Sequence, residues 1–503
     1  MALDLLLVHP GNRHLIYQAL GEKTSAVTTP IWCGMIAHEA RAAGLSVAIL
    51  DAEAEDLTAW ETANRVAEMR PRVAAIVACG HQPSASTQNL AMTYEIEHSL
   101  RVFSWSGRIL ILGGAVATIW PTLITRSGPD TFHARGDGTA TAIGLAKAIR
   151  DAAPSIDAPG LIRRDSATTA VAAPPVALDH APRVAYDLMN TSKYRAHNHH
   201  ALTGPRTPYA SLYASLGCSW RCDFCCIQAP FKDGSPNTVG TNAYILKPPN
   251  IVVEEIDWLV DNWGATTLRF DDEMFGLNRR WLDELCDLLS QRPYVDRLNL
   301  WAYSRIDQKS LAGGMLEKMR AAGFRWICPG IESAVDRVRD GVGKGGYGVE
   351  DTIRAVRAAE SAGIEVLANF IVGLPDDTED TIRETFALAC ELNTAWLNVY
   401  SCLPYVGSKL YEDVSRDHPE WLPETWDGYS QHSYATKPLP TKSLSAAQVL
   451  ESRDRFFVDY FSRPEYEVML RRKFEDGAVA MVREMLAVPM RRKLLGDPPP
   501  GAD

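Results

Sequence analysis

Three closely spaced cysteines carry the strongest chemical signal in the sequence. Cys218, Cys222 and Cys225 follow a short apolar run, in the spacing C-x3-C-x2-C. Intracellular thiols at such intervals are metal or cluster ligands far more often than disulfide partners. A structural zinc site is one alternative, but it needs a fourth ligand, and no second C-x2-C or H-x3-H pair lies nearby. Three thiolates on a cubane iron-sulfur cluster would instead leave one iron open to a substrate or cofactor. For the zinc alternative, three histidines upstream of the cysteines also have side chains of a type that binds zinc: His197, His199 and His200.

The remaining cysteines do not suggest a disulfide framework, because ten cysteines in 503 residues are too sparse for one. A thioredoxin-like redox pair is a weaker alternative for the C-x2-C part of the group. Cys226 directly follows Cys225, which holds the spaced position. We therefore expect Cys226 to pack into the fold as a spare thiol.

Composition and charge indicate a soluble, enzyme-sized globular protein of roughly three domains. Hydrophobic residues make up 46% of the chain and charged residues 22%. The formal net charge of -11 disfavours binding to nucleic acid phosphates. The longest apolar run, Ile109 to Trp120, is too short to span a membrane, and Asp4 stands where a secretory signal has positive charge. We expect a cytoplasmic protein without a membrane span.

Residues 1–150 alternate short apolar runs with helix-like segments, which predicts a doubly wound, Rossmann-like α/β domain. Each run ends in polar or glycine-rich residues such as GGAVAT and RGDGT, where ligands bind in parallel sheets. The expected strands are Leu5–His9, Ser46–Asp51, Val73–Cys79, Ile109–Gly113 and Phe132–Arg135.

Residues 151–208 are rich in Ala, Pro, Ser and Thr and are expected to form a linker. A second alternation over 209–410 then predicts a partial (β/α)6 TIM-type barrel with its chemistry at the strand C-termini. After residue 411 the sequence is dense in Trp and Tyr and then predicts two helices, so 411–503 is expected to be a mostly helical C-terminal extension. The six expected strands are Ala210–Leu216, Thr266–Asp271, Leu298–Ser304, Phe324–Ile331, Val366–Val372 and Trp396–Cys402.

The segment CSWRCDFC resembles the signature of the radical S-adenosylmethionine (SAM) superfamily, C-x3-C-x-aromatic-C, with Phe224 as the aromatic residue. This resemblance implies that Cys218, Cys222 and Cys225 hold a 4Fe-4S cluster whose open iron chelates SAM. It also implies that an electron from a donor such as flavodoxin or ferredoxin cleaves SAM to a 5'-deoxyadenosyl radical.

Later segments resemble the superfamily in the same order along the chain. Asp271, Asp272 and Glu273 stand at a strand end where relatives place a short motif near the SAM ammonium, although an acidic strand end is also a common helix cap. The segment GIES, with Gly330 and Glu332, resembles the fourth-strand motif that contacts SAM. The segment IVGLP resembles the backbone stretch that faces the adenine, although glycines at strand ends also serve plain turns.

The segment GVGKGG matches G-x-G-x-x-G but fails its structural context. It follows the helix-like SAVDRVRD instead of a strand, and Gly345 replaces the Ser or Thr of a phosphate-binding loop. We interpret it as a loop after the fourth barrel strand that can bring Lys344 towards the site.

The first domain resembles the cobalamin-binding domain that precedes the barrel in one large class of radical SAM enzymes. The resemblance rests on TPIWCGMIAHEARAAG, SVAILDAE, ILGGAVAT and RGDGT. Small residues suit a corrin that must lie close to backbone. A flavodoxin-like nucleotide site is the alternative. The implied cobalamin contacts in these segments are Gly113, Gly114, Gly136, Asp137 and Gly138.

The sequence lacks the D-x-H-x-x-G motif that supplies a histidine to cobalt in methyl-transfer and mutase folds. We therefore expect cobalamin to bind without a histidine lower ligand. Candidates for the position beneath the cobalt are Asn12, Arg13, His14 and His81.

These resemblances predict a cobalamin-dependent radical SAM C-methyltransferase that acts on an unactivated carbon of a small molecule or natural-product intermediate. A non-methylating oxidative cyclase or ring-rearranging enzyme of the same class is the main alternative. A cobalamin photosensor or regulatory module is disfavoured by the intact three-cysteine motif.

The sequence identifies substrate-binding residues less well. Arg305 can hold a carboxylate or a phosphate through two hydrogen bonds, whether that group belongs to SAM or to the substrate. Asn398, Tyr400 and Tyr405, with the aromatic loop WDGYSQHSY, are candidates for lining a pocket. Because Trp and Tyr at such density more often pack a loop onto a barrel, we favour packing for this group.

Overall fold

The computed structural model describes residues 3–11, 13–80, 83–103, 105–113, 127–163, 183–227 and 244–501. Its first part is a six-stranded sheet of order β2-β1-β3-β4-β5-β6, in which neighbours from β2 to β5 pair in parallel and β6 pairs antiparallel with β5. The strands are β1 (Leu5–His9), β2 (Val47–Asp51), β3 (Val73–Val77), β4 (Arg108–Leu112), β5 (Thr131–Ala134) and β6 (Leu161–Ile162).

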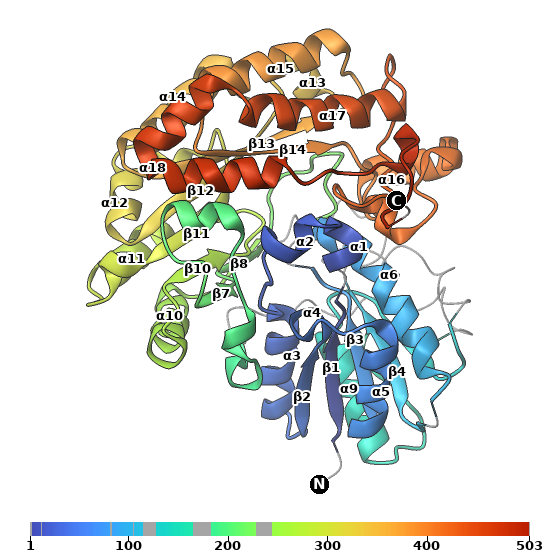
Figure 1. The fold of residues 1–503 in the computed structure, drawn as a ribbon. Helices are drawn as coiled ribbons and strands as arrows, with labels where there is room; N and C mark the ends of the chain where they lie inside the picture. Colours follow the sequence, from blue (N-terminus) through green and yellow to red (C-terminus); the bar gives the residue numbers. More distant parts are fainter. Residues whose placement is uncertain are drawn as a thin grey trace.

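Helices cover both faces of this sheet because alternate strand residues point to opposite sides. Leu5 and Leu7 belong to one apolar cluster with residues of α3 and α9, whereas Leu6 and Val8 belong to a second cluster with residues of α5 and α6. Figure 1 shows this domain in blue and cyan. The helices are α1 (Arg13–Tyr17), α2 (Leu20–Lys23), α3 (Ile31–Ala42), α4 (Ala52–Glu55), α5 (Ala59–Met69), α6 (Pro83–Leu100) and α9 (Thr139–Arg150).

The second sheet is parallel throughout, and its strand order, β14-β13-β12-β11-β10-β7, follows the chain. Among the described residues β14 and β7 do not pair with each other, so the sheet is a half-barrel. These two sheets confirm the expected α/β class, with a doubly wound first sheet and a partial barrel. The strands are β7 (Tyr209–Leu212), β10 (Thr267–Phe270), β11 (Asn299–Arg305), β12 (Phe324–Glu332), β13 (Glu365–Val372) and β14 (Trp396–Ser401).

One expected strand, Ala210–Leu216, was wrong as a single element. The chain leaves the sheet after Leu212 and forms β8 (Ser215–Gly217), which pairs antiparallel with β9 (Tyr244–Leu246). Asp272 accepts the backbone N–H of Ala214 at 2.9 Å, which holds this change of direction. The loop with the three cysteines therefore starts from a separate hairpin, not from a barrel strand.

Helices between successive strands cover the outer face of the half-barrel, and the buried apolar residues of all but the short helix α13 join the same large apolar cluster. The short helix α13 directly precedes the segment GVGKGG, as the sequence predicted. These helices are α10 (Pro249–Trp263), α11 (Arg279–Ser290), α12 (Met315–Ala321), α13 (Asp336–Asp340), α14 (Val349–Ser361) and α15 (Glu379–Leu392).

The C-terminal part adds two long helices, α17 (Ala446–Phe461) and α18 (Pro464–Leu486), of which α17 lies against β13 and β14 and α18 packs against α17 (Figure 1). Phe456 and Tyr460 of α17 pack into the barrel core. The expected change to loops after residue 411 falls inside a helix, α16 (Lys409–Asp417). The extension is therefore packed against the barrel and helps to enclose it.

Single turns of 3-10 helix shape the connecting segments. Three of them occur in the described part of the expected linker, where Ala185 joins the core of the first sheet and Tyr186 joins the barrel core. They are η2 (Tyr186–Leu188), η3 (Thr191–Lys193), η4 (Asn198–Leu202), η6 (Val295–Arg297), η7 (Lys309–Leu311), η8 (Pro419–Trp421), η9 (Trp426–Tyr429) and η10 (Lys493–Leu495).

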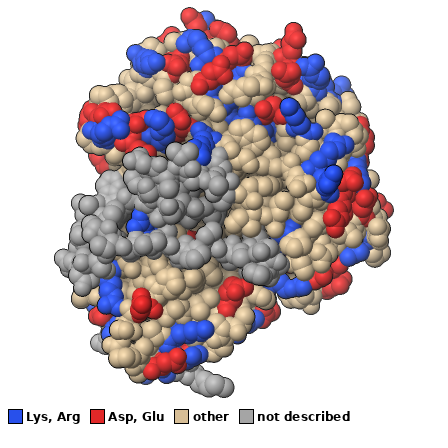
Figure 2. Space-filling view, turned by 180° about the vertical axis from the view of Figure 1, so that it is seen from behind, with Lys and Arg blue, Asp and Glu red and all other residues tan. Residues whose placement is uncertain are grey.

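The described surface carries charges of both signs. Figure 2 shows Lys and Arg interspersed with Asp and Glu over one face, beside a broad area of other residues. Within the parts of the chain that the structure describes, no helix combines the length and apolar character needed to cross a membrane.

Candidate active site and cofactor cavities

The three spaced cysteines line one cavity at the C-terminal ends of the barrel strands, here called the cysteine cavity. Two backbone hydrogen bonds hold the loop that carries them, one within the loop and one to the segment after α13. The backbone N–H of Cys225 donates to the carbonyl of Cys222 at 3.0 Å, and that of Asp223 donates to the carbonyl of Val342 at 3.0 Å. Phe224 is half-buried, lines the cavity and packs against the apolar cluster that contains Val342. The aromatic residue of the motif thus anchors the cysteine loop to the barrel.

Burial is the largest influence on the thiols. It raises the pKa values of Cys218 and Cys222, and the ammonium of Lys344 partly offsets this at both. Burial raises the pKa of Cys225 still further. A thiol with a raised pKa is held in its neutral form until a bound metal replaces the proton, because a coordinating thiol is deprotonated.

Cys226 is also buried and lines the same cavity, and burial raises its pKa to about 12. The expectation that it packs into the fold therefore agrees with its position. In the described residues no group of three or more His, Cys, Asp or Glu side chains is arranged to hold a single metal ion. The cysteines instead surround a shared space, which suits a cluster with several metal atoms better than one tetrahedral ion.

Of the three consecutive acidic residues, only Glu273 lines the cysteine cavity. It accepts the backbone N–H of Gly217 at 2.9 Å, and burial raises its pKa to about 8. Asp272 accepts hydrogen bonds from Ala214 and Ser215. The expected role of all three beside the SAM ammonium stays a prediction; in this structure Asp272 is held by partners in the strand ends, and Asp271 pairs with Arg269.

Glu332 enters the cavity through an irregularity of its strand. The pairing of β12 with β13 shifts between Gly330 and Glu332, and Glu332 has a φ of 65°. Such bulges turn a side chain to a new direction, and non-glycine residues with positive φ are frequent at functional sites. Its carboxylate lies 2.8 Å from the ammonium of Lys344, which also lines the cavity. The segment GVGKGG therefore brings Lys344 to the site, as expected of a loop.

Arg305 lines the same cavity from the end of β11 and is 3% exposed. Its guanidinium pairs with Asp307 at 2.8 Å and lies over the ring of Trp220, 4.7 Å from the centroid. One of its nitrogens, Nη1, is buried without a hydrogen-bond partner among the described residues. A buried donor without a partner at a cavity wall is suited to an anionic group of a ligand.

The segment IVGLP contributes less than expected. Ile371 lines the cysteine cavity, whereas Gly373 does not. The N–H of Gly373 donates to Asp377 at 2.9 Å, and a Cβ at this position would lie 2.3 Å from Val449 of α17. The close approach of α17 and a φ of 83° by themselves require glycine here, and the expected contact of this segment with adenine stays a prediction.

A second cavity, here called the sheet-edge cavity, lies at the C-terminal edge of the first sheet. Arg13 lines it from α1, with its guanidinium 2.9 Å from Asp56 and 3.5 Å from Glu53. His9 and Tyr17 also line it, and burial lowers the pKa of His9. Sequence reasoning did not select Tyr17, because nothing in its spacing distinguishes it from a core tyrosine.

The other expected cobalamin contacts behave differently. His14 is largely exposed and pairs with Asp56, and Asp137 accepts the N–H of Thr139 at the start of α9.

The expected glycine contacts lie close to other parts of the protein. A Cβ on Gly113 would lie 2.7 Å from that of Ala78, and one on Gly138 would lie 2.8 Å from that of Leu112. These two glycines are therefore required by protein packing and by positive φ. Gly136 also has a positive φ, 91°. Three expected contacts lie outside the residues that the structure describes in full: Asn12, His81 and Gly114.

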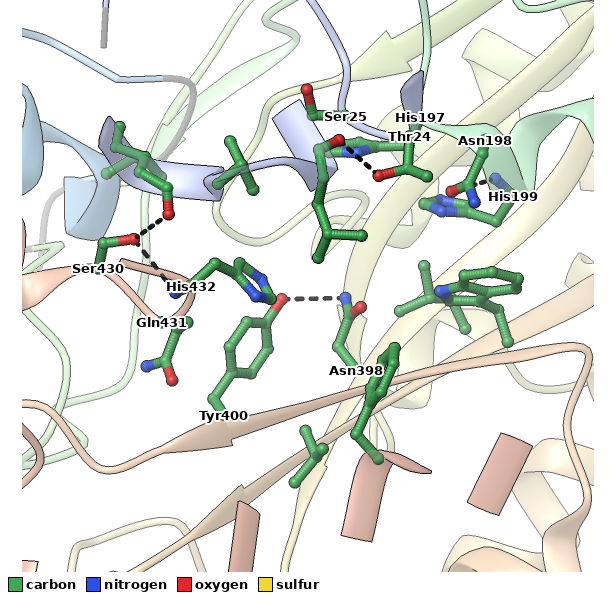
Figure 3. A pocket seen from close by; sticks show the side chains of 18 of the residues that line it. Thr24, Ser25, His197, Asn198, His199, Asn398, Tyr400, Ser430, Gln431 and His432 are labelled. Atoms are coloured by element: carbon green, nitrogen blue, oxygen red, sulfur yellow. Dashed lines mark hydrogen bonds between the residues drawn. The ribbon is translucent and has the colours of Figure 1, made fainter. Parts of the chain in front are cut away.

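A third cavity, here called the central cavity, lies between the first domain, the half-barrel and the C-terminal helices, and is shown in Figure 3. Asn398 and Tyr400 of β14 line it, joined by a hydrogen bond of 2.9 Å, and Tyr405 lines it as well. The packing interpretation was wrong for these three residues, because Asn398 and Tyr400 lie on β14 at the open edge of the sheet, and Tyr405 follows that strand. It holds for Tyr429, which is buried and stacks on Trp426, a residue that packs against an apolar cluster.

The three cavities adjoin one another. The central and sheet-edge cavities share Tyr17 and Gln88, and the central and cysteine cavities share Tyr303, Tyr400 and Tyr405. A continuous set of side chains therefore leads from the edge of the first sheet to the three cysteines. Three chemical groups could meet across this space while water is kept out by the surrounding domains.

Comparisons with known proteins agree with this geometry. A sequence model described as the radical SAM superfamily matches residues 212–389, from the end of β7 into α15. An uncharacterized methyltransferase of Pyrococcus horikoshii is 24% identical over 478 residues, which cover 94% of this chain and 95% of that protein. An anaerobic magnesium-protoporphyrin IX monomethyl ester cyclase of Cereibacter sphaeroides is 23% identical over 458 residues, 89% of this chain and 69% of the relative.

A solved structure shows the same arrangement of sheets. The radical SAM methyltransferase TsrM from Kitasatospora setae, solved with cobalamin and a 4Fe-4S cluster bound, aligns with a TM-score of 0.63 and 17% identity. The alignment covers 96% of this chain and 99% of that one. At this identity the likeness concerns the fold: a first parallel sheet, a half-barrel and C-terminal helices.

Proposed function

This chain belongs to the radical SAM superfamily, and we propose that it is a cobalamin-dependent C-methyltransferase that acts on an unactivated carbon of a small molecule. The continuity of the three cavities carries this proposal. Methyl transfer to such a carbon needs a radical generator, a methyl donor and a substrate within reach of each other, and the three adjoining cavities offer a place for each.

The proposal divides the chain as the sequence suggested. Residues 1–150 would bind cobalamin, 151–208 would connect, 209–410 would hold the cluster and SAM, and 411–503 would cover the barrel. The methyltransferase among the relatives, which matches along most of its length, supports this function. The fold that is shared with a cobalamin-bound methyltransferase supports the assignment of the first domain.

We assign the binding roles from the walls of the cysteine cavity. When bound, the cluster and SAM would supply hydrogen-atom abstraction, and cobalamin would supply the methyl group. Cys218, Cys222 and Cys225 would hold the cluster. Glu273 and Glu332 offer carboxylates to the amino group and hydroxyls of SAM, and the unpartnered Nη1 of Arg305 offers a donor to a carboxylate.

The cobalamin would lie at the sheet-edge cavity. A donor set of Arg13, Tyr17 and Gln88, together with the backbone near Gly80, suits the amide-rich edge of a corrin. His9 and His197 also line this cavity, so the proposal that cobalt takes no histidine ligand is open to a direct test. The optical and electron paramagnetic resonance spectra of cobalamin-loaded protein should be unchanged in His9→Gln and in His197→Gln. Loss of nitrogen coupling in either variant would contradict it.

The decisive experiment is product analysis of the reconstituted enzyme with SAM and a reductant such as flavodoxin or ferredoxin. Methylation of an unactivated carbon should give both S-adenosylhomocysteine and 5'-deoxyadenosine, together with a product that has gained one methyl group. A product with a new ring or a rearranged ring, formed with 5'-deoxyadenosine alone, would instead place the chain beside the cyclase relative.

A further inference from the structure

We propose that the central cavity binds its substrate through a carboxylate, so that the substrate is a small molecule that joins a carboxylate to a flat apolar body. This inference rests on the proposed function only in taking the occupant to be the substrate. It is carried by three features of the cavity wall: its charge balance, its unpartnered donors and its aromatic residues.

The charge balance at the α17 side of the cavity is positive. Arg453 lines the cavity and is 4% exposed, and Arg492 behind it is 1% exposed. Both guanidinium groups bind the carboxylate of Asp454: Arg453 through Nη1 at 2.8 Å, and Arg492 through Nε and Nη2 at 2.8 Å each. Asp497 accepts instead from the backbone N–H of Arg492. Two buried guanidinium groups thus share one carboxylate.

The described wall of the cavity carries no acidic side chain that would balance this positive charge. Its described lining residues include Arg269 and Arg453 but no Asp or Glu. The other hydrogen bond of Arg453 goes from Nε to the carbonyl of Val399 at 2.9 Å, and Nη2 makes none among the described residues. A buried positive charge without its own counter-ion is costly, and an anionic ligand would relieve that cost.

Buried donors without partners lie elsewhere on the cavity wall. Nη2 of Arg269, Nδ2 of Asn198 and Nε1 of Trp301 have no hydrogen-bond partner in the part of the chain that the structure describes. All three residues line the central cavity. The charge of Arg269 is already matched by Asp271, whose Oδ1 lies 2.5 Å from Nε. Its free Nη2 donor therefore favours an oxygen acceptor of a ligand more than it requires a second charge.

Aromatic rings form the remaining walls. Trp301, Trp396 and Phe457 line the cavity, and the ring of His199 lies 5.3 Å from that of Trp396. Figure 3 shows His199 on one side of the space and Asn398, Tyr400 and His432 on the other. Flat apolar groups pack well between such rings. The carboxylate of the ligand would lie towards Arg453, and its apolar body between the rings.

The test is binding of a matched pair of probes to the full chain loaded with cluster, cobalamin and SAM. Naphthalene-2-carboxylate and naphthalene-2-carboxamide have the same flat body and differ in charge. Isothermal titration calorimetry should give a dissociation constant about ten-fold lower for the carboxylate, the size expected for one hydrogen bond to a charged group. Equal affinities, or no binding of either probe, would overturn the proposal. So would weaker binding of the carboxylate to protein loaded with SAM than to protein without SAM, because the site would then be that of SAM.

Two arginine variants of α17 test whether Arg453 causes the preference for the carboxylate. Arg453→Gln should abolish the preference for the carboxylate, whereas Arg455→Gln should retain it, because Arg455 is exposed on the same helix and loses the same charge. A loss of equal size in both variants would contradict the proposal.

A second variant keeps the proposal testable if Arg453→Gln does not fold. Asn398→Asp is nearly isosteric and places a carboxylate on the cavity wall, so it should reverse the preference towards the carboxamide. An unchanged preference would contradict the proposal. A carboxylate preference without any methylated product would leave this inference in place and remove the proposed function. Methyl transfer to a neutral substrate, without a preference for the carboxylate, would leave the proposed function in place and overturn this inference.

Discussion

The ammonium of Lys344 lies 2.8 Å from the carboxylate of Glu332, and both side chains line the cavity that the three cysteines share. The two residues are 8% and 5% exposed, so neither charge has much access to bulk water. Glu332 stands on a strand and Lys344 on the loop after α13. Their pairing therefore fixes this loop against the sheet beside the cysteines.

Breaking this pair should destabilise the protein markedly. Lys344→Met leaves the buried carboxylate of Glu332 without a partner, so we expect the free energy of unfolding to fall by about 3 kcal/mol. The double variant Lys344→Met/Glu332→Gln should recover much of that loss. Thermal and urea unfolding of the protein without cofactors measures both. Lys442→Met, which removes an exposed ion pair with Asp376, should cost less than about 1 kcal/mol. An equal cost for the two lysines would contradict the buried pairing.

The cysteine assignment predicts a sharp contrast between neighbours. Cys218→Ala, Cys222→Ala and Cys225→Ala should each lose most of the iron and the brown colour after anaerobic reconstitution. Cys226→Ala is the matched control, because Cys226 lines the same cavity but lies outside the C-x3-C-x2-C spacing. Iron analysis and visible absorbance would read the result. Zinc in the purified protein, or equal iron loss in Cys226→Ala, would refute the assignment.

Substitution of Glu273 should weaken SAM binding, whereas substitution of the adjacent Asp272 should lower the stability of the fold. Glu273→Ala removes a carboxylate from the cavity wall and should weaken SAM binding several-fold, measured by equilibrium dialysis. Asp272→Ala leaves the N–H of Ala214 and the hydroxyl of Ser215 without their acceptor, and should lower the free energy of unfolding by about 1–3 kcal/mol. The proposal that Glu273 contacts SAM would be lost if the two variants weakened SAM binding equally.

Asp51 should make stability depend on pH. Burial raises its pKa to about 7, despite hydrogen bonds from Ala54 and Tyr194. In the unfolded chain an aspartate titrates near pH 4, so between about pH 4 and pH 7 the folded state holds a proton that the unfolded state has lost. The contribution of this carboxyl is complete below the unfolded pKa, and it is lost as the pH rises through the folded pKa.

Asp51→Asn removes this titration: its amide oxygen can accept the N–H of Ala54, and its amide nitrogen can donate to the hydroxyl oxygen of Tyr194. Its unfolding free energy should therefore fall less steeply with pH than that of the wild type, by about 1.4 kcal/mol per pH unit at most. Unfolding midpoints at pH 5 and pH 7 measure the difference. Asp187→Asn on the surface is the control. A wild-type slope in Asp51→Asn would show that this carboxyl does not hold its proton in the folded state.

Local sequence patterns predicted much of the fold. Leu5–His9 is a strand in both the prediction and the structure, because a short apolar run bounded by polar residues suits a strand buried on both faces. The chemistry of the C-x3-C-x2-C motif also depends on few residues in one loop. Its residue types and spacing by themselves indicated a metal cluster, and through it the family that the sequence model matches.

The central cavity could not be predicted in this way. Its walls come from α1, η4, β10, β11, β14 and α17, which are far apart in the chain. Asn398 and Tyr400 looked like packing residues because sequence density does not reveal which strand lies at the open edge of a sheet. Likewise, the sequence does not show which of the acidic residues Asp271, Asp272 and Glu273 faces the cavity. In the structure, hydrogen bonds at the strand ends leave Glu273 at the cavity wall.

The sequence by itself determined the local properties: which segments form strands and helices, and which three thiols can bind a cluster. These depend on the period of apolar residues and on short spacings, which neighbouring residues decide. Only the tertiary structure decided which side chains face a shared space, because that depends on long-range packing of the two sheets and the C-terminal helices. The chemistry of this protein requires both, since the cysteine loop is local and the cavities beside it are not.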